Sequence, residues 1–170
     1  MNDDARYALG ANIHRLRQAR GLSLSQLASA AGMAKSNLSR MEQGGGNPTL
    51  ETVWRLALQL GVPFGTLVAP LENALVDDGV QVQLIEQGEG PPQVEAYWMR
   101  CAPHTERRAE AHPPGTRETL VLISGRLLAG EHGALTTLSP GDSLSIAADR
   151  AHLYRTEDEG ASLVMTITYH

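Results

Sequence analysis

The chain has little of what several protein classes require. Its 170 residues contain one cysteine, Cys101, so neither a disulfide framework nor a zinc site built from several thiolates can form within it. No apolar run approaches the roughly 20 residues that a membrane-spanning helix needs. The acidic start, Met1 to Asp4, is not followed by an apolar segment, so no secretory signal is expected. These absences predict a cytoplasmic protein that does not associate with a membrane.

Charge is distributed unevenly along the chain. The net charge is −5 overall, but residues 1–70 hold seven basic and four acidic side chains. Residues 71–170 hold seven basic and fifteen acidic side chains. The first part is therefore basic and the second strongly acidic. This asymmetry indicates that the first part meets a polyanion such as nucleic acid and the second does not.

Apolar side chains in the first part recur at helical spacing. Leu9, Ile13 and Leu16 predict a helix over residues 7–20, which Gly21 ends. Ser23 forms a capping box with the glutamine three residues later, as expected at the start of a second helix. Further helices are predicted to end near residues 31, 43, 59 and 68, the third starting at about residue 35 and the fourth after a Thr49 cap.

From about residue 80 the hydrophobic period changes to two. Strands are predicted over residues 80–84, 94–101, 119–124 and 162–169, separated by glycine and proline turns. Short strands with such turn signals suggest a small sandwich or barrel. We therefore expect a helical domain over residues 1–69, a linker over 70–79 and a β domain over 80–170.

The helical part carries a recognisable motif. The segment LSLSQLASAAGMAKSNLSRMEQG (residues 22–44), followed by NPTLE (residues 47–51), resembles the lambda-repressor-like family of Cro and Xre regulators over about residues 9–68. The resemblance implies a five-helix domain that places its third helix on DNA. Two positions depart from the family pattern: Leu24 replaces a glutamine that often touches DNA, and Ala34 replaces the usual Ser or Thr N-cap.

The predicted third helix has one apolar and one polar face. With Leu38 and Met41 directed inward, polar side chains cover the opposite face, which on an ordinary helix would only be solvated. In this motif such a face reads base edges and phosphates. The residues expected to contact DNA are Gln26, Lys35, Ser36, Asn37, Ser39, Arg40 and Gln43. The resemblance also implies a structural ion pair between Arg17 and Glu42.

Two segments of the second part resemble cupin motifs over about residues 100–158. They are EAHPPGTRE (residues 110–118) with Gly125, and PGD (140–142) with AHLY (151–154). The resemblance implies a double-stranded β-helix barrel and matches its metal ligand positions to Glu110, His112, Glu118 and His152. Glu110 stands where the family has a histidine, and the gap before Glu118 is one residue longer than usual.

Two imidazoles and two carboxylates suit one divalent ion, either zinc, iron, manganese or nickel. The alternative is a barrel that has lost its metal and binds an organic ligand directly, or serves only in dimerisation. The pocket polar groups expected are Tyr97, Arg117 and Tyr154.

Together these features predict an α+β protein of two domains, a five-helix DNA-binding domain and a small antiparallel cupin barrel. We expect a sequence-specific transcription regulator, not an enzyme, that binds operator DNA as a homodimer and responds to a small-molecule effector. Two alternatives stay open: a cupin metalloenzyme with a DNA-binding appendage, and an antitoxin-like regulator whose second domain holds a protein partner. The sequence does not specify the effector or the operator.

Overall fold

The computed structural model describes residues 1, 3–71 and 75–170. Contacts between residues divide the chain into two compact units, Met1–Leu75 and Val76–His170, here called the helical unit and the sheet unit. Residues 72–74 of the expected linker lie outside the described residues. The next three residues of that expected linker, Leu75–Asp77, form a strand, β1.

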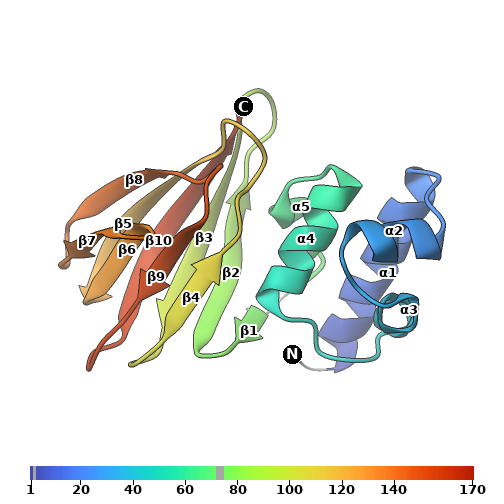
Figure 1. Ribbon diagram of the computed structural model, residues 1–170, viewed down its shortest axis with the longest axis horizontal. Helices are drawn as coiled ribbons and strands as arrows, with labels where there is room; N and C mark the ends of the chain where they lie inside the picture. The colour runs from blue at the N-terminus through green and yellow to red at the C-terminus, as the bar shows by residue number, and fades with distance from the viewer. Residues whose placement is uncertain (2, 72–74) are drawn as a thin grey trace. The chain divides into compact units, whose positions relative to one another are not determined.

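The described part of the helical unit contains the five helices that the sequence predicts (Figure 1). They are α1 (Asp3–Ala19), α2 (Leu24–Ala30), α3 (Lys35–Glu42), α4 (Leu50–Leu60) and α5 (Phe64–Val68). Helix α1 begins four residues before the predicted start. Its first turn carries two acidic side chains, Asp3 and Asp4, which the partial positive charge of a helix N-terminus stabilises. Among the described residues, no helix is both long and apolar enough to cross a membrane.

Local capping sets where these helices begin and end. The Ser23 hydroxyl accepts a hydrogen bond from the Gln26 amide, and the Gln26 side chain accepts one from the Ser23 amide, so the predicted capping box is present. The Thr49 hydroxyl caps α4 by accepting from the Thr52 amide at 3.1 Å. Gly61 ends α4 in the left-handed conformation that favours glycine.

Helices α1, α3 and α5 are held closely together. Asn12 of α1 donates hydrogen bonds to the carbonyls of Thr66 and Leu67, at 2.9 and 2.8 Å. A Cβ atom at Gly10 would lie 2.2 Å from the Met41 carbonyl oxygen, so only glycine permits this approach of α1 to α3. The side chains that fill the core between the helices include Leu9, Ile13, Leu27, Leu38, Val53 and Leu56.

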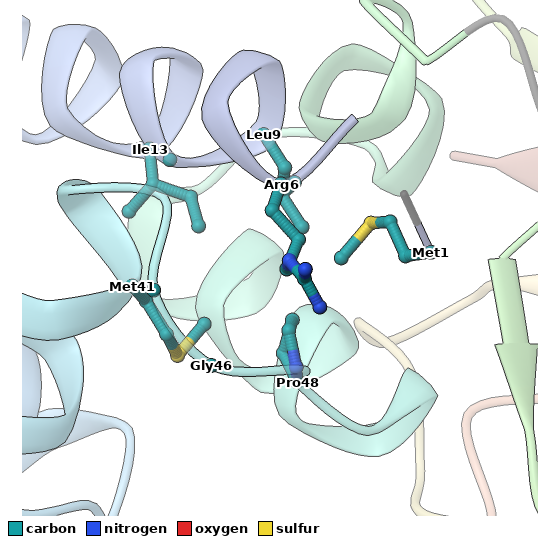
Figure 2. A pocket seen from close by; sticks show the side chains of 9 residues that line it. Met1, Arg6, Leu9, Ile13, Met41, Gly46 and Pro48 are labelled. Carbon is teal, nitrogen blue, oxygen red and sulfur yellow. The ribbon is translucent and has the colours of Figure 1, made fainter. Parts of the chain in front are cut away.

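A small hollow lies beside the contact between α1 and α3 (Figure 2). Leu9 and Ile13 line it from α1, and Met41 and Pro48 line it from α3 and the following loop. Its volume of about 10 Å³ holds roughly one water molecule. This hollow is therefore too small to bind an organic effector.

The described residues of the sheet unit, with Leu75, form ten strands in two antiparallel sheets (Figure 1). One sheet has the order β1-β2-β3-β10-β5-β8 and the other β4-β9-β6-β7. The strand bounds are β1 Leu75–Asp77, β2 Val80–Gln87, β3 Gln93–Cys101, β4 Glu106–Ala109, β5 Arg117–Gly125, β6 Leu127–Glu131, β7 Ala134–Leu138, β8 Ser143–Ala147, β9 His152–Arg155 and β10 Ala161–Tyr169. β2, β3, β5 and β10 match predicted strands; the others were not predicted individually.

The core of the sheet unit lies between its two sheets. Strand register aligns Tyr97, Met165 and Leu120 across β3, β10 and β5, and all three are buried. Residues one position further along each strand are more exposed, as alternation on a sheet with one covered face requires. The predicted fold class, a five-helix domain followed by a small antiparallel β domain, is confirmed, and the β domain is a two-sheet sandwich of the cupin type.

Candidate functional site

A sharp turn joins α2 to α3. Ala31 caps α2, and Gly32 follows with a φ of +64°, a conformation that a residue with a Cβ rarely adopts. The Met33 amide then donates to the Ala28 carbonyl at 2.9 Å, which closes the turn. Ala34 occupies the N-cap position of α3 in extended conformation but has no side-chain oxygen to cap the helix.

Helix α3 presents the predicted polar face. Leu38 and Met41 are buried, whereas five of the predicted DNA-contacting residues on α3 and its C-cap are exposed, namely Lys35, Ser36, Asn37, Arg40 and Gln43. Ser39 is half-buried and accepts a hydrogen bond from Gln43 at 3.3 Å. Gln26 on α2 is exposed, and its side-chain oxygen is held in the capping box. This face has the donors and acceptors that base-edge and phosphate contacts need.

A bidentate ion pair lies behind this face. Arg17 Nε and Nη2 donate to Glu42 Oε1 and Oε2 at 2.6 and 2.8 Å. His14 Nδ1 lies 2.8 Å from Glu42 Oε2, so His14 joins the pair from the helix surface. Burial alone would raise the pKa of Glu42, but the bonds with Arg17 and His14 lower it below the ordinary carboxyl value. The hydrogen bond to Glu42 likewise raises the pKa of Arg17.

A second group of chemistry-bearing residues lies inside the sheet unit. His112 precedes β5, Glu118 is on β5 and His152 begins β9, and their ligand atoms lie within 4.8 Å of one another. His112 Nε2 is 2.7 Å from Glu118 Oε1, and His152 Nε2 is 3.4 Å from Glu118 Oε2. The Tyr154 hydroxyl also donates to Glu118 Oε2. The three side chains of the cluster are almost completely buried.

The hydrogen bond on the far side of the His152 ring fixes its tautomer. His152 Nδ1 lies 2.8 Å from the Arg150 carbonyl oxygen, which can only accept, so Nδ1 carries a proton. In the neutral ring, Nε2 then presents its lone pair toward Glu118 and His112. Nε2 is buried and makes no hydrogen bond with any residue that the structure describes. An Nδ1–H bonded to a backbone carbonyl is the usual arrangement of a metal-ligating histidine.

The groups of the cluster change the pKa values of one another. Burial would raise the pKa of Glu118, but His112 and His152 together lower it well below the ordinary carboxyl value. Burial would lower the pKa of His152, but Glu118 and the Arg150 carbonyl raise it overall. Burial and the adjacent Glu118 charge raise the pKa of Tyr154, so its hydroxyl keeps its proton. Glu118 is therefore ionised, as a carboxylate that binds a metal must be.

Comparison with known proteins supports a helix-turn-helix in the helical unit and also finds a relative that matches along the whole chain. The helix-turn-helix family model HTH_3 matches residues 13–67. The HTH-type transcriptional regulator SutR of Escherichia coli is 34% identical over 176 residues, which span all of this chain and 96% of that protein. The chain belongs to the HTH_3 (Xre) transcription regulators with a C-terminal cupin domain.

Further relatives match this regulator over all or part of its length. An uncharacterised HTH-type regulator of Sinorhizobium fredii, y4dJ, is 38% identical over 70 residues, 41% of this chain and 91% of that protein. An HTH_3 family regulator from Vibrio cholerae shares the fold with a TM-score of 0.88 and 22% identity, over 100% and 99% of the two chains. The cupin domain of an XRE family regulator from Enterobacter cloacae matches 54% of this chain and 98% of its own, with a TM-score of 0.51 and 24% identity.

The structure brings together three of the regulator's four predicted metal ligands. The fourth, Glu110, is exposed and does not belong to the cluster. Glu110 lies between β4 and β5, outside the group of side chains whose ligand atoms converge. Of the predicted pocket residues, Tyr154 contacts the cluster and Tyr97 lies in the same core. Arg117 is exposed and donates to Ser145 on the outer face, so it does not line the interior.

One buried carboxylate of the regulator was not predicted from the sequence. Glu95 on β3 is fully buried and accepts hydrogen bonds from Tyr97 at 2.5 Å, Tyr169 at 3.0 Å and Gln87 at 2.9 Å. The β alternation through Tyr97 to Cys101 could have revealed it, because a residue two positions before Tyr97 shares its face. Glu95 and Glu118 are thus two described carboxylates inside the sandwich, each with hydrogen-bond donors beside it.

Proposed function

We propose that this regulator binds operator DNA sequence-specifically through α3 and that its sheet unit binds a ligand that modulates operator affinity. The observation that carries the first part is the exposed polar face of α3, which follows a capped α2 and a glycine turn. In helix-turn-helix proteins the second helix of the motif enters the major groove with its first residues against base edges. Asn37 and Arg40 are the residue types that read adenine and guanine in two-bond contacts.

The buried cluster fits a divalent metal ion. His112, Glu118 and His152 would hold it, and two imidazoles with one carboxylate are suitable ligands for zinc, iron, manganese or nickel. The fit is supported by His152 Nε2, a buried nitrogen that has no hydrogen-bond partner among the described residues. A metal held by these three residues would keep open positions for an oxygen or nitrogen of a small molecule.

The proposed operator-binding form is a homodimer. A single helix-turn-helix contacts few base pairs, whereas two copies related by a two-fold axis read two half-sites about 34 Å apart. Residues Trp98, Val164 and Val121 form one row on the outer face of neighbouring strands β3, β10 and β5. On these three described strands, the stretch of the outer face between Arg100 and Arg117 carries no charged side chain. An uncharged, partly apolar sheet face suits contact with a second copy.

A ligand in the sheet unit can change operator binding only by favouring one of two forms of the dimer. A tenfold change in operator affinity requires about 1.4 kcal/mol of coupling between the two sites. The cluster is the proposed ligand site, so replacing His112 and Glu118 together by alanine should remove the response to the ligand. DNA binding without the ligand should be retained.

Selection of bound sequences from a random DNA library tests the function directly. The full-length protein should enrich a sequence with two related half-sites, and light scattering of the purified protein should give the mass of a dimer. Enrichment of no sequence above the starting library would refute sequence-specific binding. A monomer in both free and DNA-bound states would refute the dimer.

A further inference from the structure

Arg107 lies on β4, a strand of the four-stranded sheet. In the antiparallel pair of β4 and β9, Arg107 lies opposite Tyr154, and Ala109 lies opposite His152. Residues opposite each other in such a pair project to the same side of the sheet. Tyr154 is buried and its hydroxyl reaches Glu118, so this side faces the interior. Arg107 therefore projects from the same face as two residues of the buried cluster.

The other arginines of these two strands have a carboxylate partner. Arg108 Nη2 lies 2.7 Å from Glu106 Oε1, and Arg155 Nη1 lies 3.9 Å from Glu106 Oε2. Both contacts are on the outer face. For Arg107, by contrast, the described residues provide no side-chain hydrogen bond and no ion pair, although the residue is only partly exposed. A guanidinium withdrawn from water is stabilised by an anion, and it binds one best through two parallel hydrogen bonds.

Among the described residues, no carboxylate inside the sandwich serves as this anion. Glu118 is engaged by His112 and Tyr154. Glu95 is engaged by its own three donors and lies six residues along β3 from Cys101, about 20 Å in an extended strand. Arg107 instead lies near Cys101. Burial raises the pKa of the Cys101 thiol to about 11, and the positive charge of Arg107 opposes that rise.

Arg107 lies at the edge of its sheet and is partly exposed. Strand β4 is the edge strand of its sheet, and Figure 1 shows it beside β9. Arg107 and His152 are diagonal neighbours on this strand pair, a relationship that separates side-chain origins by roughly 7–8 Å. A small molecule held by Arg107 at one end therefore has a second polar group within reach of the cluster.

We propose that Arg107 binds the oxyanion group of the ligand, so that the ligand of the sheet unit is a small organic acid. This inference rests on the proposed ligand-sensing function of that unit. The acid group pairs with the Arg107 guanidinium beside Tyr154, and the rest of the molecule extends toward His152. Arg107 is the residue that selects acids over neutral or cationic compounds of the same size.

Isothermal titration calorimetry on the full-length protein tests this assignment. The probes are acetate, succinate and inorganic phosphate at constant ionic strength, with chloride as the reference anion and ethylene glycol as the neutral compound. Four proteins are compared: the parent, Arg107→Met, Arg107→Lys and the matched outer-face control Arg108→Met. Circular dichroism and thermal melting in chloride show whether each variant folds.

At least one oxyanion should bind the parent and Arg108→Met equally, and ethylene glycol should not bind. Arg107→Met should weaken that binding at least tenfold, and Arg107→Lys should retain part of it because the charge remains. A carboxylate preference or a phosphate preference identifies the acid group. Equal binding by the parent and a folded Arg107→Met, or binding of no oxyanion at millimolar concentration, overturns the proposal. If Arg107→Met does not fold, Arg107→Lys decides: binding as tight as the parent's overturns the proposal, and a measurable loss supports it.

DNA selection on the same four proteins separates this inference from the function on which it rests. Arg107→Met should select the same DNA as the parent in the absence of ligand. Failure of the parent to select any DNA would refute the regulator function. Intact DNA selection combined with absent oxyanion binding would refute only the role of Arg107.

Discussion

The guanidinium of Arg17 on α1 donates hydrogen bonds to both carboxylate oxygens of Glu42, the last residue of α3. Each side chain is only 7% exposed, so the pair is almost fully withdrawn from water. The pair attaches the end of the helix that carries the DNA-contacting face to the first helix of the unit. The position of that face therefore depends on the pair as well as on the apolar core.

Removing one partner of this pair should strongly destabilise the helical unit. Arg17→Met leaves the Glu42 carboxylate buried with only His14 beside it, and such a loss costs about 3–5 kcal/mol. Urea denaturation followed by the helical circular dichroism signal measures the change. Glu131→Gln is the control, because its ion pair with Arg150 is exposed and should contribute under about 1 kcal/mol. Equal effects of the two substitutions would contradict a structural role for the buried pair.

The same pair should make the helical unit sensitive to acid. The pKa of Glu42 is lower in the folded state than its ordinary value, so ionised Glu42 stabilises the fold. This stabilisation is complete above the unfolded pKa of about 4.3 and is lost as the pH falls through the folded pKa. In urea titrations between neutral and acid pH, the stability difference between the parent and Glu42→Gln should shrink as the pH falls. A difference that stays constant would show that Glu42 does not titrate with folding.

A serine at position 34 should stabilise α3. Ala34 already has the extended N-cap conformation but lacks an oxygen for the first amides of the helix. Ala34→Ser should therefore add about 1 kcal/mol, or several degrees in the melting temperature of the helical unit. Ala30→Ser at the end of α2 is the control and should not stabilise, because serine there does not occupy an N-cap. A melting temperature unchanged by Ala34→Ser would mean that this helix end is already satisfied.

Arg40 should contribute to base recognition. Arg40→Ala should weaken operator binding by about 1–3 kcal/mol and relax the preference at one base position, which gel-shift titration and repeated DNA selection measure. Lys35→Ala should instead weaken binding to all sequences and reduce the salt dependence by about one counterion. Arg126→Ala removes one charge from an exposed turn of the sheet unit and serves as the control. Unchanged affinity in Arg40→Ala would show that the recognition face is placed wrongly.

The buried cluster should determine the metal content of the protein. The parent, purified without chelator, should carry about one divalent ion per chain by mass spectrometry of the elements. His152→Ala and Glu118→Gln should each lose most of it, because each removes one of three protein ligands. His132→Ala replaces an exposed histidine and should keep it. A parent that binds none of zinc, iron, manganese or nickel after incubation and dialysis would contradict the metal proposal.

Several features were predictable because they depend on neighbours in the sequence. The Ser23 and Gln26 capping box, the Thr49 cap and the Gly61 helix end each involve residues within a few positions of one another. The periodicity of Leu9, Ile13 and Leu16 likewise predicts a helix and its buried side. The resemblance to known motifs supplied the longer-range elements, namely the partnership of Arg17 with Glu42 and the grouping of His112, Glu118 and His152.

The sequence by itself thus determined the five helices, the order of a helical and a β domain, and the polar face of α3. Only the tertiary structure decided which charged residues of the sheet unit lie inside. Arg107 and Arg108 are adjacent in a strand without apolar alternation, and their sides are set by pairing with β9, which lies more than 40 positions further along the chain. Glu95 and Glu118 enter the core, whereas Glu110 does not, because strand register and sheet stacking place side chains between the two sheets or outside them. Both depend on contacts between distant segments, which local patterns do not specify.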